Sequence, residues 1–479
     1  MNRIPRWIRV SLCFMPLAFV WALANPMFGM NDEPAHMIRA QGVVRGDFKD
    51  PYTTDGLPGE QYNCVFWQAK TADCMDLTWM PDGTVQSSPT NNYPPLFHLV
   101  TGIPSLIFSG LSGAYIMRLW LALICSLVLG WAIDLLLARS PSRFTLVATT
   151  VGVTPMLVFC MSGVAPSGLS TVTAAALWAG GLGVFSPSAT TNARRSQWTF
   201  GIAALLFPFL RRDAFLWEMM IVTCLAGSTS LVVARRLLRR RSTWVLLGVA
   251  SFAVALVWTV WASDATTSFS SNASSHFGGS WASGLGQIYT YILMLIGCFG
   301  WNSTWMSSEM LVLVLCTCAV VLFIGFANAS RHILRSLSLV TLLFFVSPVV
   351  IGAVRAYYMQ GRYLFPLWIG IFVLAGQAFG SLPVSSDAGR RIFRTLVIVQ
   401  VIYQFFAFAQ NQRRYIVGAQ GTWRFLTLDG VWSPPMMSNL ATMFVFMAAM
   451  AISLICARSV VSTLEHVDGR PEPDTRVSA

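Results

Sequence analysis

The stretch VSLCFMPLAFVWALANPMFGM, residues 10–30, is followed at once by NDEPAHMIR, residues 31–39. The first stretch is almost wholly apolar and is long enough to cross a bilayer as a helix. The second places two carboxylates, Asp32 and Glu33, at the rim of that helix. Carboxylates beside hydrocarbon are costly unless they face a water-filled cavity or a substrate. A carboxylate is also a simple general base for a hydroxyl. The pattern predicts chemistry on a lipid-borne substrate at the outer face.

Composition indicates an integral membrane protein. The 479 residues are 55% hydrophobic and 11% charged, with a mean hydropathy of +0.60, whereas soluble domains carry roughly 25% charged residues. The net charge of +12 lies in short loops between apolar runs. This is the positive-inside pattern, so we expect membrane lipids and no nucleic acid as partners. No nucleotide-binding P-loop or Rossmann fingerprint occurs.

The fold class predicted is all-α, a polytopic membrane protein of about twelve spanning helices. The expected spans are 10–30, 117–138, 144–162, 168–186, 198–210, 213–233, 243–263, 308–328, 335–353, 362–381, 392–409 and 437–457. Every second loop is rich in Arg, which predicts that both termini are cytoplasmic. The span 198–210 is short and contains Pro208, so a broken or re-entrant pair lining a cavity is expected there. The first span is interpreted as an uncleaved signal anchor rather than a cleaved signal peptide.

Two outer loops are predicted to carry helices that do not span. The loop 31–116 holds nine of the twenty acidic residues, and its apolar part, 93–108, is interrupted by glycine and proline. We expect this part to lie in the outer interface. The loop 264–307 contains a second interfacial or re-entrant helix at 287–299. Residues 1–458 are predicted to form the transmembrane domain, and 459–479 a disordered cytoplasmic tail.

Two further predictions concern cysteines and metals. Cys64 and Cys74 lie in the outer polar stretch, where they can pair as a disulfide. The remaining cysteines lie mostly inside apolar runs, where cysteine packs as an ordinary small apolar residue. Neither a CxxC motif nor His-rich zinc spacing occurs, so no metal is expected.

The residues after the acidic pair extend the candidate site. If 32–40 is helical, positions 32, 36 and 39, or 33, 36 and 40, fall on one face. That face would combine an acid, the His36 imidazole and the Arg39 guanidinium. An anionic phosphate needs such an arginine. The alternative interpretation of His36 is a structural hydrogen bond only.

A second group lies at QGRYLFP, residues 360–366. Tyrosines at this level are typical of an interfacial aromatic belt, which accounts for Tyr357 and Tyr358. An outer Arg362 opposes the positive-inside bias, and beside Gln360 it suits capture of a phosphate and of sugar hydroxyls.

Two more patterns each have two interpretations. Arg211-Arg212-Asp213 together with Arg118 forms either an ion pair between short helices or a phosphate clamp. Trp301, in Phe-Gly-Trp at 299–301, stacks on a sugar or is an interfacial tryptophan.

Four motifs carry a resemblance to a known family. They are NDEPAHxxRA at 31–40, YPPL at 93–96, FGW at 299–301 and QGRYLxP at 360–366. In this order they resemble an uncharacterised family of bacterial polytopic membrane proteins, domain of unknown function family 2142. That family is grouped with the GT-C glycosyltransferases.

The resemblance implies a mechanism and a site. An acid in the first outer loop acts on the acceptor hydroxyl, and the donor is a polyprenyl-phosphate sugar. Asp32 or Glu33 is then the base. The implied substrate-binding residues are His36, Arg39, Tyr93, Arg118, Arg212, Trp301, Gln360, Arg362 and Tyr363. No acid closely follows Trp301 or Ala165, where relatives are expected to carry one, which favours a metal-free, single-carboxylate mechanism without a cofactor.

The resulting prediction is an inverting glycosyltransferase of a bacterial inner membrane. It would transfer a sugar to a cell-envelope glycan, lipid or protein. A competing hypothesis is an oligosaccharide polymerase or ligase using lipid-diphosphate substrates, in which Arg212 and Arg362 are essential and Asp32 is not. Two hypotheses without catalysis also remain open: a carrier of lipid or sugar, and a scaffold for envelope assembly.

Overall fold

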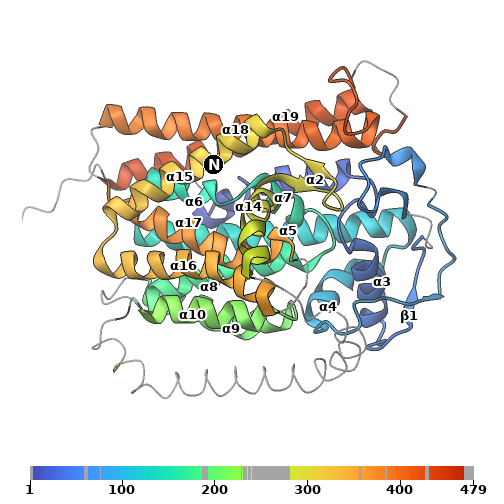
Figure 1. Cartoon of the computed structure of the whole chain (residues 1–479), viewed down its shortest axis with the longest axis horizontal. Helices are drawn as coiled ribbons and strands as arrows, with labels where there is room; N and C mark the ends of the chain where they lie inside the picture. The colour runs from blue at the N-terminus through green and yellow to red at the C-terminus, as the bar shows by residue number, and fades with distance from the viewer. Residues whose placement is uncertain are drawn as a thin grey trace, which may run out of the picture.

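Most of the chain is helical, because an apolar segment in lipid satisfies its backbone groups best within a helix. The computed structural model describes residues 4–58, 63–75, 77–185, 192–227, 281–354, 359–382, 386–426 and 431–468, together with residues 229, 235 and 239. The predicted span 243–263 and the tyrosines Tyr357 and Tyr358 lie outside the described residues. The long helices run side by side, and α3, α4 and β1 lie together at one end of the bundle (Figure 1).

The α-helices of the described residues are α1 (Arg6–Ser11), α2 (Met15–Ala24), α3 (Glu33–Val44), α4 (Leu96–Gly102), α5 (Gly110–Arg139), α6 (Arg143–Val151), α7 (Pro155–Met161), α8 (Pro166–Val184), α9 (Ala193–Leu206), α10 (Ala214–Gly227), α14 (Trp281–Gly297), α15 (Ser308–Asn328), α16 (Arg331–Val354), α17 (Phe365–Phe379), α18 (Ser386–Val417) and α19 (Asn439–Asp468). Short 3-10 helices include η1 (Asn63–Val65), η2 (Ala72–Cys74), η3 (Ile103–Leu106), η4 (Phe207–Phe209) and η6 (Gly361–Leu364).

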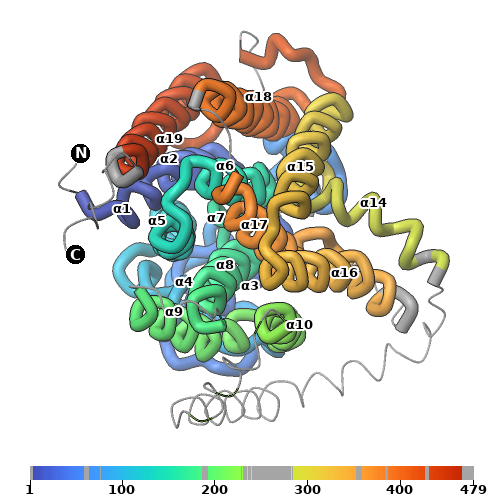
Figure 2. Tube along the Cα trace, turned by 90° about the vertical axis from the view of Figure 1, so that its left-hand side faces the viewer, coloured from blue at the N-terminus to red at the C-terminus, as the bar shows by residue number. Residues whose placement is uncertain are grey.

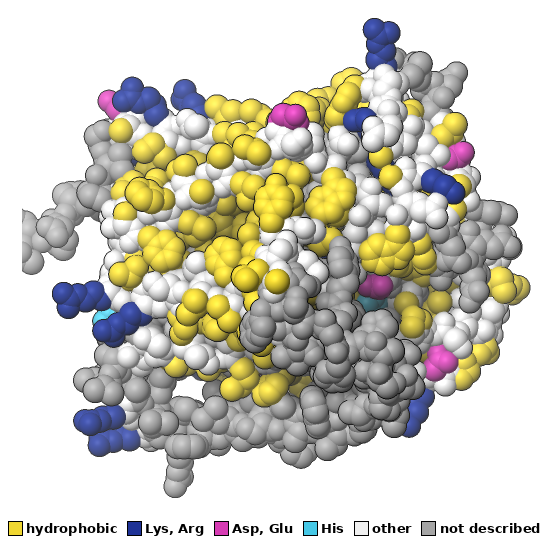
Figure 3. All heavy atoms as spheres, in the orientation of Figure 1, with side chains coloured by type: hydrophobic (Ala, Val, Ile, Leu, Met, Phe, Trp, Pro, Cys, Tyr) yellow, Lys and Arg dark blue, Asp and Glu magenta, His cyan; other side chains and the backbone are white. Residues whose placement is uncertain are grey.

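The helices differ in how deeply they are buried: some form an inner layer, and others expose large apolar side chains at the surface. α8 packs against α5, α9, α10 and α17 (Figure 2), and α17 is buried along almost its whole length. In contrast, α15 and α19 expose large apolar side chains, with Phe323 76% and Phe444 58% exposed. Hydrophobic side chains cover the middle of the face in Figure 3, with Lys and Arg side chains at its left edge. Exposed apolar surface on this scale suits a bilayer.

The described chain shows fewer clear spans than the twelve predicted. Seven helices are long and apolar enough to cross a membrane, or eight if the bent pair α6 and α7 is one span. α8 nearly coincides with the predicted span 168–186, but its Ala, Gly, Ser and Thr lower its hydropathy. α9 and α10 have 14 residues each, about 21 Å of helix, too short to cross untilted.

Three predicted boundaries need correction. The expected span 144–162 is two helices that meet at 79°, because Pro155 begins α7 and Thr154 accepts a hydrogen bond from the Leu157 N–H. The first span stops at Ala24 because Pro26 disfavours helix at the preceding residue. The tail expected to begin at 459 is helical to Asp468.

The extension of α19 is explained by its packing. Val460 and Leu464 are buried, and Arg9 donates to the Ser459 carbonyl over 2.9 Å. α1 and the end of α19 therefore lie at the same end of the bundle.

Two short hairpins depart from the purely helical expectation. β1 (Tyr52–Thr54) pairs antiparallel with β2 (Thr84–Gln86), and β3 (Cys298–Phe299) pairs with β4 (Thr304–Trp305). Strands of two or three residues are too short to show a period of two in the sequence. The second hairpin fixes the turn that carries Trp301.

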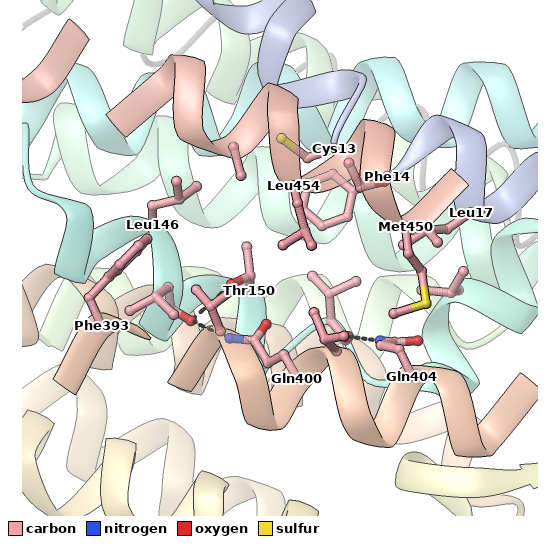
Figure 4. Close-up of a pocket in the computed structure, with 17 residues that line it drawn as sticks. Cys13, Phe14, Leu17, Leu146, Thr150, Phe393, Gln400, Gln404, Met450 and Leu454 are labelled. Carbon is pink, nitrogen blue, oxygen red and sulfur yellow. Dashed lines mark hydrogen bonds between the residues drawn. The ribbon is translucent and has the colours of Figure 1, made fainter. Parts of the chain in front are cut away.

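A cavity of about 130 Å³ lies between α2 and the turn before it, α6, α7, α18 and α19. Its lining is mainly apolar, and the Gln400 and Gln404 amides donate to the Val147 and Val153 carbonyls (Figure 4). It shares no residue with the acidic pair of the sequence analysis. We therefore look for the functional site at the α3 end of the molecule.

Candidate functional site

The two adjacent carboxylates point to different environments. The helix α3 begins at Glu33 with Pro34 in its first turn, and Asp32 precedes it with φ 63° and ψ 2°. The left-handed conformation is uncommon for a residue other than glycine, and such conformations cluster at functional sites. It turns the two side chains apart: Glu33 is fully buried, whereas the Asp32 side chain is 43% exposed.

Glu33 is enclosed by protein donors. Arg118 donates from Nε to Oε1 over 2.8 Å and from Nη2 to Oε2 over 2.5 Å, and the Val164 N–H donates to Oε1 over 3.0 Å. The remaining Arg118 N–H groups bind the carbonyls of Ala22, Asn25 and Pro26. Arg118 therefore has no N–H left for a phosphate. The pair joins α5 to the segment between α2 and α3.

Asp32 instead pairs with Arg362, which lies 330 residues later in the chain. Arg362 Nη2 lies 2.5 Å from Asp32 Oδ2, and the arginine side chain is only 4% exposed. Arg362 Nε has no hydrogen-bond partner among the described residues. η6 presents Arg362 here because it packs closely against α14, where a Cβ at Gly361 would clash with the Tyr291 carbonyl oxygen.

A second arginine approaches the same place. The Arg211 guanidinium carbon lies 4.5 Å from the centre of the Tyr363 ring, and that of Arg362 lies 5.6 Å from it. Arg211 is held by both Asp213 oxygens and by Ser167 Oγ. Two arginines thus share one tyrosine beside a partly exposed carboxylate, and each is paired with an aspartate, Arg211 with Asp213 and Arg362 with Asp32.

The structure places Arg211, rather than Arg212, in this group. Arg211 is buried, whereas Arg212 is exposed. Adjacent residues on an irregular segment point in different directions, and only the tertiary structure decides which one turns inward. The Ser167 hydroxyl that orients Arg211 lies at the start of α8, in a stretch to which sequence reasoning had assigned no role.

His36 forms part of a buried aromatic group beside the site. Its Nδ1 lies 3.1 Å from His98 Nε2, and its ring centre lies 5.2 Å from that of Tyr93. Burial lowers the pKa of His36 to about 3, so the imidazole is neutral near pH 7. Burial also raises the pKa of the Tyr93 hydroxyl to about 12. His36 therefore offers no positive charge to a phosphate, and the structural interpretation of this residue gains weight.

Arg39 lies behind the same group. It is fully buried and donates through Nη2 to the Tyr93 carbonyl. Burial lowers its pKa to about 10, so it stays charged at neutral pH. Its observed role is to hold the Tyr93 segment against α3.

The remaining predicted residues are Trp301 and Gln360. Trp301 Nε1 donates to the Phe28 carbonyl over 2.9 Å, and the Phe66 ring lies 3.7 Å from the Trp301 ring. Phe66 thus covers a face that a sugar would need. Gln360 is buried, and its Oε1 has no hydrogen-bond partner among the described residues.

The segment between β1 and β2 contains a disulfide. Cys64 and Cys74 are joined, with their Cα atoms 6.1 Å apart. Within the described ranges, no group of three or more His, Cys, Asp or Glu side chains is placed to hold a metal ion.

Comparisons with known proteins agree with a membrane protein. A family model described as "Predicted membrane protein (DUF2142)" matches residues 15–371. No curated protein matches the chain. Two crystal structures of ArnT from Cupriavidus metallidurans are similar, each over 95% of this chain and 76% of that chain. The structure bound to undecaprenyl phosphate is 14% identical with a TM-score of 0.41, and the apo structure 13% identical with 0.47.

Proposed function

The chain belongs to the DUF2142 family of predicted membrane proteins, and we propose that it is a membrane glycosyltransferase. It transfers a sugar from a polyprenyl-phosphate donor to a cell-envelope acceptor at the outer face. The observation that carries the proposal is the Asp32–Arg362 pair, a half-exposed carboxylate held by a buried arginine. Arg211, whose guanidinium carbon lies 4.5 Å from the centre of the Tyr363 ring, adds a second cation.

Asp32 is the proposed base. Arg362 holds Oδ2, which leaves Oδ1 to accept the proton of the acceptor hydroxyl. The acceptor oxygen then attacks the anomeric carbon of the donor, and the bond from that carbon to the phosphate oxygen breaks. The departing oxygen takes the bonding electrons, and direct displacement inverts the anomeric centre. Glu33 is unsuited to this step because Arg118 and Val164 already occupy both of its oxygens.

The arginines stabilise the leaving group. Preorganised donors aimed at developing negative charge are a large source of rate acceleration. Arg362 Nε is free of partners among the described residues, so it can donate to a phosphate while Nη2 still holds Asp32. The free Gln360 Oε1 is a suitable acceptor for a sugar hydroxyl.

The test uses the full chain in lipid nanodiscs with a panel of radiolabelled polyprenyl-phosphate sugars and envelope acceptors. We expect transfer from at least one donor, with the product inverted at the anomeric carbon. Asp32→Asn should lower turnover by about 10²–10⁴-fold, the usual effect of removing a general base. Binding of a donor without turnover by the wild type would favour the carrier hypothesis. A product with retained configuration would contradict direct displacement.

A further inference from the structure

The outer end of α18 carries a buried arginine that the proposed reaction does not use. The Arg414 side chain is fully buried, and its guanidinium carbon lies 4.1 Å from the centre of the Tyr415 ring. Nη2 donates to the Gln68 carbonyl over 2.6 Å and lies 3.4 Å from Ser303 Oγ. Nε and Nη1 have no hydrogen-bond partner among the described residues. No acidic side chain among the described residues pairs with Arg414. A buried cation without a counter-ion is costly, so this position suits an anion.

Three segments distant in sequence surround this guanidinium. They are the end of α18, the turn between β3 and β4 that carries Ser303, and the disulfide-closed loop 63–75 that carries Gln68. The loop lies beside the end of α18 (Figure 1). Residues 67–70 of the loop are exposed, so the Gln68 carbonyl that binds Arg414 belongs to a solvent-facing segment.

Arg414 and the residues around it are separate from the proposed donor site, but they are linked to it through the segment 28–32. Tyr415 donates to the Gly29 carbonyl over 3.0 Å, and Trp301 donates to the Phe28 carbonyl. Asp32 follows Gly29 by three residues on the same segment and pairs with Arg362. Tyr415, the neighbour of Arg414 in sequence, therefore connects the Arg414 group to the segment that holds Asp32.

We propose that Arg414 and Ser303 form a second binding site, for a phosphate group, under the loop 63–75. The guanidinium supplies three unused N–H groups, two on Nη1 and one on Nε, and Ser303 supplies a hydroxyl donor. Charge-assisted donors of this kind match phosphate oxygens. The phosphate belongs either to an anionic lipid headgroup or to a soluble molecule. The site does not depend on the proposed transferase activity.

The test measures phosphate-dependent thermal stability of the full chain in phosphatidylcholine nanodiscs. One series adds inorganic phosphate, and another replaces part of the lipid with phosphatidylglycerol. All proteins carry Arg362→Gln, which removes the proposed donor contact and keeps the two sites distinguishable. We expect the unfolding temperature of the parent to rise in at least one series. In Arg414→Gln, the phosphate or phosphatidylglycerol concentration that gives half of this rise should be at least tenfold higher than in the parent.

Arg413→Gln is the matched control, because Arg413 donates to the carbonyls of Gly421 and Ala419 nearby on the chain. Its titration should match that of the parent within twofold. A response to phosphatidylglycerol alone identifies a headgroup, and a response to inorganic phosphate identifies a soluble group. No response in either series, or equal titrations for Arg414→Gln and its parent, would overturn the proposal. If Arg414→Gln does not fold, Ser303→Ala decides: about threefold weaker binding supports the site, and unchanged binding refutes it.

Discussion

Replacing Glu33 by Gln should destabilise the protein far more than replacing the exposed Asp387 by Asn. The Glu33 carboxylate accepts three hydrogen bonds, two from Arg118 and one from Val164. A glutamine presents one oxygen and one NH₂ group, so its donor would face the donors of Arg118. The guanidinium would keep its three carbonyl partners but lose its counter-charge inside the protein. Breaking a buried ion pair in this way costs about 3–5 kcal/mol.

The expected change in melting temperature follows from the size of the chain. An unfolding entropy of about 2.1 cal/mol/K per residue gives about 1 kcal/mol/K for a chain of this length, so Tm should fall by about 3–5 °C. The assay is thermal unfolding in nanodiscs at one fixed scan rate, because unfolding of such proteins is often irreversible. Asp387→Asn is the control, since Asp387 and its partner Arg390 are 73% and 62% exposed, and it should leave Tm unchanged.

A Glu33→Gln protein whose Tm lies within about 1 °C of the control would refute this reasoning, because loss of a buried ion pair should lower the free energy of unfolding by more than that shift allows. It would also remove the argument that separates a structural Glu33 from a reactive Asp32.

Three further predictions concern neighbouring residues. Arg362→Gln should lower turnover by at least about 100-fold, as for loss of one transition-state donor, and exposed Arg212→Gln by less than about threefold; equal losses in a transfer assay would favour the ligase hypothesis. Gly361→Ala should lower both Tm and turnover, because the added Cβ would clash with the Tyr291 carbonyl oxygen; wild-type values for both would contradict the packing described for η6. The native pKa of His36, about 3, lies below the usual histidine value of about 6.5. Below pH 6.5 the unfolded chain therefore binds more protons than the folded chain, and the stability of the fold falls as the pH falls. Between pH 7 and pH 5, Tm should decline less in His36→Gln than in wild type, and parallel declines would argue against a neutral His36.

The sequence could predict the parts of the site whose chemistry is unusual for their position. Acids at the rim of a hydrophobic helix and an outer arginine in a Gln-Gly-Arg motif conflict with the ordinary pattern of a membrane protein. Those conflicts selected Asp32 and Arg362, which the structure brings to 2.5 Å from each other.

The sequence could not predict that Glu33 is enclosed in a buried ion pair while Asp32 remains accessible. It depends on the left-handed conformation at Asp32 and on a partner, Arg118, 85 residues away from Glu33. Arg118 itself was predicted to bind phosphate, because a sequence does not show that all of its N–H groups are already used. The choice of Arg211 over Arg212 also depends on a distant contact, with Ser167.

Helix existence was easier to predict than helix length. The bounds of α15 agree with the expected 308–328, because a continuous apolar run lies between polar ends. The break between α6 and α7 was missed, because Thr154 and Pro155 interrupt an apolar run without lowering its hydropathy much. Total hydropathy therefore identifies membrane segments but not their bends.

The most direct test of the central claim is to measure donor binding and turnover separately in Asp32→Asn, beside wild type and Arg362→Gln. If Asp32 is the base, the asparagine variant binds the polyprenyl-phosphate sugar within about threefold of wild type but turns over at least about 100-fold more slowly. If Asp32→Asn transfers the sugar within about tenfold of the wild-type rate at full donor occupancy, Asp32 is not the base, and the account of this site is wrong.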